Sequence, residues 1–234
     1  MANPDPGRVI AEEAISWFRA RVPITPAGWR RLEIEAKRRA FTVSQVSKLD
    51  VILDVWRAVD RAVTQGQSLE DFQAAITDRL ETAWGGTVSQ PAHRLETIYR
   101  TNTQSAYSAG RWQQQTDPDV LRARPYWLYD SVMDSQTSAL CTALNGTLLP
   151  HDHEFWATRY PPNHHRCRAG VRSLTESGAR RRGGVTPAPP TAPPLKGFDT
   201  LPGLDDWEPD LTKYPPQAVQ AYQALRKEFD DGQN

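Results

Sequence analysis

The residues of this chain that could bind a metal are concentrated in one short stretch. Both cysteines and four of the five histidines lie between residues 141 and 167. They are Cys141, His151, His153, His164, His165 and Cys167. Thiolate sulfur and imidazole nitrogen are the donors that zinc prefers in proteins. This concentration predicts a metal site.

The spacing within the stretch indicates which side chains bind the metal. His164 and Cys167 form an H-x-x-C pair on a loop, and Cys141 lies on a segment expected to be helical. We therefore predict one structural zinc held by Cys141, His164 and Cys167, with His153 as the fourth ligand. The reserve candidates for the fourth position are His151 and His165.

Other roles for the same residues stay open at this point. The two thiols could pack in the core without a metal, or form a Cys141–Cys167 disulfide in an oxidising environment. Catalysis by a metal-dependent hydrolase, either a nuclease or a peptidase, would need an open coordination position and a carboxylate base. The nearby carboxylates are Asp134, Asp152 and Glu154, although Asp134 is better explained as a helix N-cap. A Cys–His nucleophile pair is also conceivable, but no oxyanion hole is recognisable in this sequence.

The charge balance excludes a global attraction to nucleic acid or anionic lipid. Twenty-eight basic residues balance 28 acidic ones, and the formal net charge at pH 7 is zero. A contact with DNA would therefore be local, and the candidates are the consecutive Arg180, Arg181 and Arg182.

The lack of a recognisable targeting signal and the small number of cysteines favour an intracellular protein. No apolar run approaches about 18 residues, so we expect no membrane span, and the first residues lack the pattern of a signal peptide. Two cysteines cannot form a secreted disulfide framework. We expect the chain to be made and kept in a reducing cytoplasm.

The first 115 residues show apolar residues at helical spacing, with matching start and stop signals. Helices are expected over residues 6–20, 26–40, 44–65, from 68 to the glycines at 85 and 86, and 91–115. Thr25 is a suitable N-cap with Pro26 at the first helical position. Gly66 ends the clearest apolar stripe, and Ser68 begins a capping-box-like S-x-x-D.

The last of these helices also carries a row of polar side chains. The row comprises Arg100, Asn102, Thr103, Gln104 and Arg111. Because polar side chains are mostly exposed in proteins, we expect this row to be a solvated face.

The pattern changes after residue 123, where the elements become shorter. Strands are expected over residues 124–132, 147–150 and 168–174, helices over 135–145 and 152–160, and a last helix over 216–229. Asp134 is the expected N-cap of its helix, and Gly146 follows the helix end. Prolines at 187, 189, 190, 193 and 194 predict an extended polyproline II segment.

Together these patterns predict a predominantly helical α+β protein with an N-terminal helical body, a small α+β module and an extended proline-rich arm. The expected segments are 1–115 (helical body), 116–178 (α+β module with the Cys/His cluster), 179–198 (proline-rich linker) and 199–234 (C-terminal docking segment).

Three stretches, in this order, resemble the Mu F-like minor head proteins of tailed bacteriophages, also called the phage head morphogenesis family. They are RLETIYRTNTQSAYSAGRW from residue 94, RPYWLYDSVMDSQTSALCTALNGTLLPHDHEFW from 124 and YPPNHHRCRAGVRSL from 160. Related members often show D-x-R-T-C-x-x-C-x-x-L-x-G followed by P-P-x-H-x-x-C-R. This chain departs from the pattern at Gln136, the arginine position, and at Ser138, the first cysteine position. The second departure removes one implied ligand, so a zinc site here must recruit a histidine or water, or has been lost.

The resemblance implies a minor structural component of the virion rather than an enzyme. Its implied partners are the portal protein and the major capsid protein, with packaged DNA as a further partner and no membrane. Its implied location is the capsid interior or portal vertex, and the host cytoplasm during assembly. The alternatives are a metal-dependent hydrolase and a DNA-binding accessory protein.

Overall fold

The computed structural model describes residues 12–199 and 208–231 of the 234-residue chain. Within these residues the protein is predominantly helical with a few short strands, which confirms the expected α+β class. The described residues up to Tyr99 and from 208 onward form one compact unit, here called the helical unit. Residues 100–199 form the second, the sheet unit. The four segments expected from the sequence stay a prediction. No helix in the described part is long and apolar enough to cross a bilayer.

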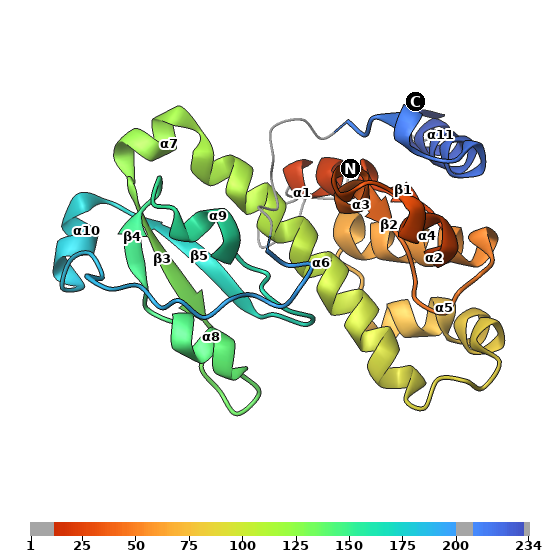
Figure 1. The fold of residues 1–234 in the computed structure, drawn as a ribbon, viewed down its shortest axis with the longest axis horizontal. Coiled ribbons are helices and arrows are strands. Elements are labelled where there is room, and N and C mark those ends of the chain that lie inside the picture. Colours follow the sequence, from red (N-terminus) through yellow and green to blue (C-terminus); the bar gives the residue numbers. More distant parts are fainter. Residues whose placement is uncertain (1–11, 200–207, 232–234) are drawn as a thin grey trace, which may run out of the picture. The chain divides into compact units, whose positions relative to one another are not determined.

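The helical unit is built from short and long helices with one small parallel strand pair (Figure 1). Its elements are α1 (Glu12–Arg19), β1 (Val22–Pro23), α2 (Pro26–Arg31), α3 (Ile34–Arg39), β2 (Ala40–Phe41), α4 (Leu49–Gln65), α5 (Leu69–Trp84), the start of α6 (Pro91–Thr116), η1 (Leu211–Lys213) and α11 (Pro216–Asp231).

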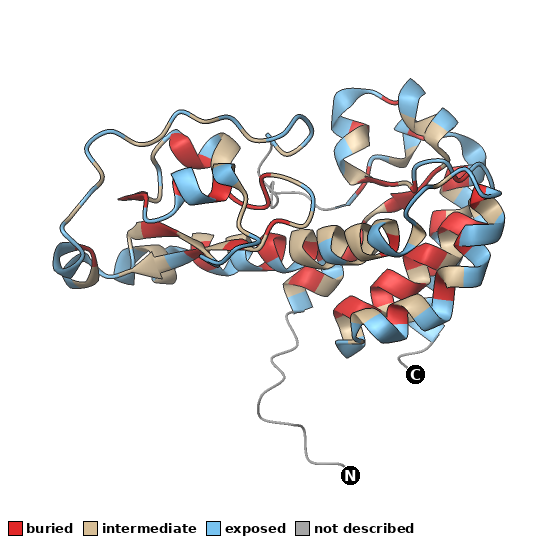
Figure 2. Ribbon diagram, turned by 90° about the horizontal axis from the view of Figure 1, so that it is seen from below, coloured by how far each residue is buried: buried red, intermediate tan, exposed pale blue. Residues whose placement is uncertain are grey.

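The apolar stripe of α4 forms the centre of the helical unit. Ile52, Val55, Trp56 and Val59 on this helix are all completely buried. Figure 2 shows helices on which buried and exposed stretches alternate. Gly66 ends α4 in the left-handed conformation, as expected.

Two expected helix boundaries were wrong. The helix predicted over 44–65 begins only at Leu49, because Gln45 has a φ of 64°, which an α-helix cannot include. The helix predicted over 26–40 is interrupted, because Leu32 and Glu33 have extended backbones. This interruption lets the buried Leu32 join an apolar cluster with β1 and α11.

The predicted capping box at the start of α5 is confirmed. The Ser68 hydroxyl accepts a hydrogen bond from Asp71 N at 3.1 Å, and the Asp71 carboxylate accepts one from Ser68 N at 3.0 Å. Two N–H groups that the helix itself leaves without acceptors are thereby satisfied.

The C-terminal segment packs on the N-terminal strand pair within the helical unit. Tyr214 and Tyr222 are buried in the same cluster as Val22 and Ile24, and Val219 packs against it half-buried. The Tyr214 hydroxyl donates to Ala36 O at 2.7 Å. Trp207, in the same expected docking segment, lies outside the described residues.

The sheet unit contains a three-stranded antiparallel sheet in the order β4-β3-β5 (Figure 1). Its elements are the remainder of α6, α7 (Pro118–Ala123), β3 (Tyr126–Ser131), α8 (Ala139–Leu144), β4 (Leu148–Pro150), α9 (Phe155–Arg159), β5 (Ala169–Leu174) and α10 (Glu176–Arg181). One sheet face carries Trp127, Tyr129 and Val171 into a cluster with side chains of α8 and α9.

Side chains of α6 cover the outer edge of β5. Gln104 Nε2 donates to Ala169 O at 3.0 Å, and Gln115 Nε2 donates to Val171 O at 2.9 Å. The expectation of a solvated polar row on this helix was therefore wrong for Gln104. An edge strand presents backbone groups to any passing strand, and these two glutamines occupy two of its carbonyls.

Two further local predictions need correction. Asp134 does not cap the helix after β3, because that helix, α8, begins at Ala139 with Ser138 as its N-cap. The three consecutive arginines do not all lie in extended chain: Arg180 and Arg181 form the end of α10, and Arg182 follows as its C-cap residue. All three arginines are exposed.

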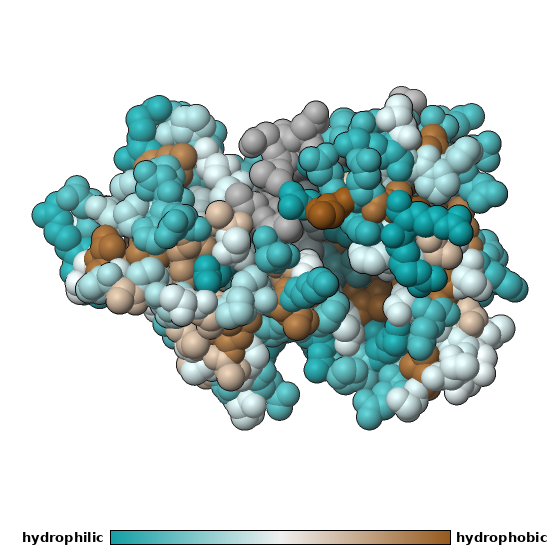
Figure 3. Space-filling model, viewed as in Figure 1, coloured by the Kyte–Doolittle hydropathy of each residue, from teal (hydrophilic) through white to brown (hydrophobic). Residues whose placement is uncertain are grey.

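Hydrophilic residues cover much of the surface on the face drawn in Figure 3, and apolar residues lie between them in separate spots. The large apolar side chains that are most exposed in the described part are Ile34, Tyr107, Val132, Met133, Val185 and Leu195.

Candidate metal centre

The first ligand candidate is positioned by the start of α8. The Ser138 hydroxyl accepts a hydrogen bond from Cys141 N at 3.1 Å, so the serine caps the helix and orients its first turn. This turn directs the buried Cys141 side chain toward Tyr129 of β3, where the Tyr129 hydroxyl lies 3.6 Å from Cys141 Sγ.

The other two candidates come from the loop between α9 and β5. Cys167 N donates to His164 O at 3.2 Å, which closes a turn between the two side chains. Arg166 takes a left-handed φ of 57° in this turn, and its N–H donates to Thr101 Oγ1 of α6 at 3.2 Å. The H-x-x-C segment therefore forms a hydrogen-bonded turn, and the contact with Thr101 holds this turn against α6.

Three of the predicted ligands meet at one point. Cys141 Sγ lies 3.6 Å from Cys167 Sγ and 3.2 Å from His164 Nε2, and the three donor atoms all lie within 4.8 Å of one another. Tetrahedral zinc with bonds of about 2.3 Å to sulfur and about 2.05 Å to nitrogen separates two sulfurs by about 3.8 Å, and sulfur from nitrogen by about 3.6 Å. The donor types are those of a zinc site; the observed sulfur–sulfur distance is close to the value for zinc, and the sulfur–nitrogen distance is shorter than that value.

The fourth predicted ligand is not part of this group. His153 lies just before α9, where its Nδ1 accepts a hydrogen bond from Phe155 N at 3.1 Å. The reserve candidates are also elsewhere: the His151 ring lies 6.1 Å from the Trp127 ring centroid, and the His165 ring 5.0 Å from that of Phe198. In the described part of the chain, the group consists of Cys141, His164 and Cys167 alone.

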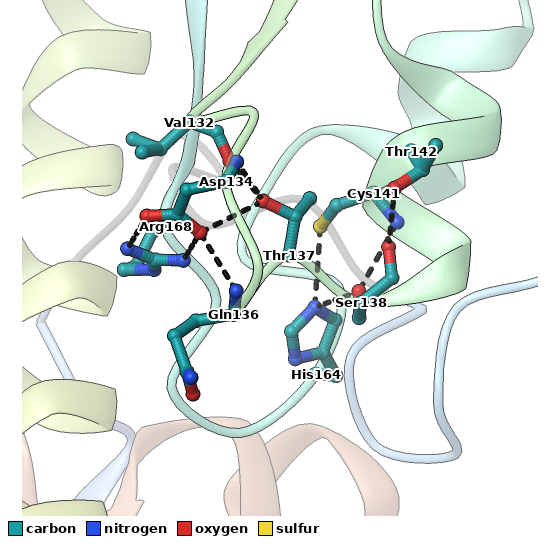
Figure 4. A network of polar contacts seen from close by, with 9 residues as sticks. All are labelled: Val132, Asp134, Gln136, Thr137, Ser138, Cys141, Thr142, His164 and Arg168. Atoms are coloured by element: carbon teal, nitrogen blue, oxygen red, sulfur yellow. Dashed lines mark hydrogen bonds and ion pairs between the residues drawn. The ribbon is translucent and has the colours of Figure 1, made fainter.

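Ser138 is the residue that the ligand prediction missed. Its Oγ lies 2.8 Å from His164 Nε2, so it stands directly beside the donor atoms (Figure 4). A cavity of about 20 Å³ lined in part by Ser138, Cys141 and His164 adjoins the group. This volume is enough for about one water molecule. One sequence signal could have placed Ser138 beside the metal-binding group: it occupies the position at which the family pattern often has a cysteine.

The contacts within the group favour one thiolate. The hydrogen bond with Cys167, together with that from His164, lowers the pKa of the Cys141 thiol well below its ordinary value. The same contact with Cys141, together with burial, raises the pKa of Cys167. The hydrogen bond with Cys141 also raises the pKa of His164. A thiolate is the form of cysteine that binds metals.

Backbone amides surround the second sulfur. Hydrogen bonds from the backbone of Asn163 and Ala169 lower the pKa of Cys167, against the larger effect of Cys141. Donors of this kind stabilise a thiolate ligand without changing its coordination.

A separate ion pair fixes the loop after β3. Arg168 contacts the Asp134 carboxylate through two nitrogens, and Asp134 also accepts hydrogen bonds from Gln136 N at 2.9 Å and from the Thr137 hydroxyl at 3.2 Å (Figure 4). This carboxylate is therefore engaged with neighbouring side chains, and no carboxylate belongs to the metal-binding group among the described residues.

Comparison with known proteins identifies the family. Residues 54–172 match the family described as Phage Mu protein F like protein. The chain is 34% identical over 190 residues to the putative capsid assembly protein F of Escherichia phage Mu, and this alignment covers 75% of this chain and 43% of that protein. It is also 34% identical over 170 residues to the Mu-like prophage FluMu F protein of Haemophilus influenzae, covering 68% of this chain and 40% of the relative. The chain thus spans less than half the length of these two relatives.

No solved structure gives a significant match to the chain. The matches to the two relatives cover 75% and 68% of the chain. The region that matches the family includes β3, α8, β4, the first residues of β5 and all three clustered donor residues. The chain therefore belongs to the Mu F-like family of phage proteins.

Proposed function

We propose that this chain acts in the assembly of a bacteriophage head, as a minor structural component of the virion. The observation that carries this proposal is the 34% identity to a protein named as a putative capsid assembly protein, over 75% of the chain. Head assembly requires contacts with other head proteins, and we propose the portal protein and the major capsid protein as the partners. The chain would then reside in the capsid interior or at the portal vertex, after assembly in the host cytoplasm.

Interruption of the reading frame in the genome that encodes the chain tests this role. We expect the lysate to contain incomplete or empty heads and few infectious particles, and expression of the intact chain in the same cells to restore both. Electron microscopy and plaque counts provide the measurement. Normal filled heads without the chain would contradict the proposal. Cross-linking followed by mass spectrometry of wild-type particles then identifies which head proteins it contacts.

We further propose that the sheet unit holds one structural zinc through Cys141, His164 and Cys167. The type and the close meeting of the three donor atoms support this assignment, as does the adjoining small cavity, which offers room for a water molecule as fourth ligand. The ion would join α8 to the loop before β5 and thereby stabilise the sheet unit. The proposal assigns no catalytic residue.

Metal analysis of the purified chain tests the zinc site. We expect about one zinc per chain, lost in Cys141→Ser and Cys167→Ser. His153→Ala and His165→Ala are matched controls, because these histidines lie close in sequence but outside the group. Zinc that survives both cysteine substitutions would contradict the site, and zinc lost in His153→Ala would restore that histidine as a ligand.

Ser138 allows a complementary test by gain of function. A cysteine at this position would add the thiolate that related sequences often carry, so we expect Ser138→Cys to lower the zinc Kd by at least about tenfold. Ser135→Cys is the control, because it adds a thiol three residues away in the exposed loop before α8. Equal affinities of both variants would place Ser138 away from the ion.

A hydrolase is the less supported alternative. A catalytic zinc normally has a carboxylate nearby to act as base, whereas Asp134 is paired with Arg168, and Asp152 and Glu154 are exposed residues outside the metal-binding group. Hydrolysis of DNA or peptide by the purified chain, abolished in His164→Ala but not in His153→Ala, would favour this alternative.

Contact with packaged DNA is a second candidate function, favoured by an uneven distribution of charge. Residues 100–204 carry 12 lysines and arginines against eight acidic residues, although the whole chain is neutral. Arg180, Arg181 and Arg182 are exposed within this part. If they contact phosphates, replacing all three by alanine should reduce the slope of log affinity against log salt by about 3. Alanine at the exposed Arg30 and Arg31 of the helical unit is the control, and equal slopes in both variants would exclude the arginine contact.

A further inference from the structure

The proline-rich segment expected to be an arm lies along the sheet unit as a strap, here defined as residues 186–198. Thr186 N donates to Leu148 O of β4 at 2.8 Å, and the Thr186 hydroxyl accepts from Leu148 N at 2.9 Å. Further along, Leu195 N donates to Asn163 O at 2.9 Å, and the Phe198 ring meets the His165 ring edge to face. The strap thus joins β4 to the loop that carries His164 and Cys167.

A single arginine fixes the middle of the strap. Arg159, at the end of α9, donates from Nε to Ala192 O at 3.0 Å and from a terminal nitrogen to Thr191 O at 2.8 Å. Polyproline II backbone makes no internal hydrogen bonds. The strap contains no helix or strand, and its internal hydrogen bond from Phe198 N to Leu195 O closes only a turn near its end. The contacts with the rest of the sheet unit therefore hold the strap in place.

Asn163 connects the strap to the metal-binding group. Its side chain is completely buried, and Nδ2 donates both to Arg159 O at 3.0 Å and to the Tyr129 hydroxyl at 2.9 Å. That hydroxyl lies 3.6 Å from Cys141 Sγ. Asn163 immediately precedes His164, and its backbone carbonyl is the one that accepts Leu195 N. Asn163 therefore links the strap, which binds its backbone carbonyl, to Cys141, which its buried side chain reaches through the Tyr129 hydroxyl.

We propose that the strap, acting through Asn163, is a positioning element that holds the His164–Cys167 turn against Cys141. Without these contacts the loop still carries His164 and Cys167, but their side chains are no longer held in place beforehand and must become ordered when the ion binds. This ordering costs entropy, so the affinity for zinc should fall. The inference rests on the proposed zinc site, and none of the strap residues touches the donor atoms.

The test compares the zinc Kd of folded variants, measured by competition with a chromophoric chelator well below their melting temperatures. Arg159→Ala removes the two hydrogen bonds to the strap, and we expect the Kd to rise about tenfold, as for other residues that support metal ligands. Arg159→Lys keeps one cationic donor and should recover part of the affinity. Arg180→Ala is the control, because Arg180 is exposed in the same unit and pairs only with Glu176 of its own helix among the described residues.

A second variant guards against misfolding of the first. Leu195→Pro removes one N–H donor at a half-exposed position that already follows two prolines, so the fold should persist and the Kd should again rise. A merely structural strap would lower the melting temperature of both variants and leave the Kd within twofold of wild type, and that result would overturn the proposal.

A metal-free readout separates this inference from the zinc proposal. Hydrogen exchange of the Cys167 amide, which donates to His164 O, should accelerate in Arg159→Ala and Leu195→Pro but not in Arg180→Ala. If the wild-type chain takes up no zinc, the zinc proposal fails, and faster exchange would still support the positioning role. Unchanged exchange at Cys167 would overturn it.

Discussion

In the helical unit, the residues packed around α4 are almost all apolar, whereas the interior of the sheet unit mixes aromatic rings with polar groups. Five polar or charged residues are buried in the described part of the chain, and four of them belong to the sheet unit: Ser108, Gln115, Thr147 and Asn163. The exception, Asp60, pairs with Arg19 at 2.9 Å. Apolar packing is nondirectional and tolerates adjustment, whereas a buried polar group depends on particular partners.

This difference predicts which kind of substitution destabilises each unit most. The helical unit should lose stability in proportion to the apolar volume removed from its core. The sheet unit should be sensitive to the loss of single donors or of the proposed ion, because each would leave buried partners unsatisfied.

The largest effect is expected in the core of the helical unit. Trp56 is completely buried, stacks against Phe229 with ring centroids 5.5 Å apart, and donates from its indole to Arg21 O at 3.1 Å. Trp56→Ala should therefore destabilise the protein by about 3–5 kcal/mol, because it leaves a cavity and an unpaired carbonyl. Urea unfolding followed by circular dichroism measures the loss. Ile34→Ala is the control, since Ile34 is 73% exposed; a comparable loss there would contradict the assigned core.

Removal of zinc should affect the other unit. At free zinc about 100 times Kd, the ion contributes about 2.7 kcal/mol to the state that binds it. Chelation should therefore accelerate hydrogen exchange at amides of β3 but not at those of α4. Cys141→Ser should abolish the response to the chelator. Equal acceleration in both units would show that the ion, if bound, does not stabilise the sheet unit in particular.

A single buried amide should have the next largest effect. Gln115 donates to Val171 O and accepts from the Tyr160 hydroxyl, each at 2.9 Å. Gln115→Ala should cost about 1–3 kcal/mol, because both partners lose a hydrogen bond away from water. Gln113→Ala, at an exposed position on the same helix, should stay within about 0.5 kcal/mol of wild type in urea unfolding. Similar costs for the two glutamines would mean that the strand edge does not depend on this contact.

The same contrast explains what the sequence predicted well. Periodic apolar residues and helix caps identified the helices of the helical unit, and the capping box at Ser68 was correct to the residue. These signals are local, since a stripe or cap is defined by residues within a few turns. The two errors in helix boundaries arose where the backbone leaves the helical conformation although the neighbouring residues favour a helix, as at Gln45 and Leu32.

In the sheet unit the local signals were incomplete. The meeting of Cys141, His164 and Cys167 was predicted from ligand type and the H-x-x-C spacing, and the structure brings them together. His153 was chosen because it was nearby in sequence, but its ring serves the start of α9 instead. Asn163 and Gln115 could not be predicted, because their partners lie 34 and 56 residues away and an amide side chain carries no periodic signal.

The smallest expected effect is a pH dependence of the cap on α5. The hydrogen bonds from the Ser68 backbone and hydroxyl lower the pKa of the Asp71 carboxyl below its ordinary value. Because the folded pKa is depressed, the charged carboxylate stabilises the folded state above the unfolded pKa of about 3.9, and this contribution is lost as pH falls through the folded pKa. Asp71→Asn resembles the protonated acid. The melting temperature of wild type should therefore exceed that of Asp71→Asn at neutral pH, and the difference should shrink below about pH 4.

Asp78→Asn, at an exposed position of the same helix outside the capping box, is the control. A wild-type advantage over Asp71→Asn that persists unchanged to pH 2 would mean that the charge on Asp71 does not stabilise the cap.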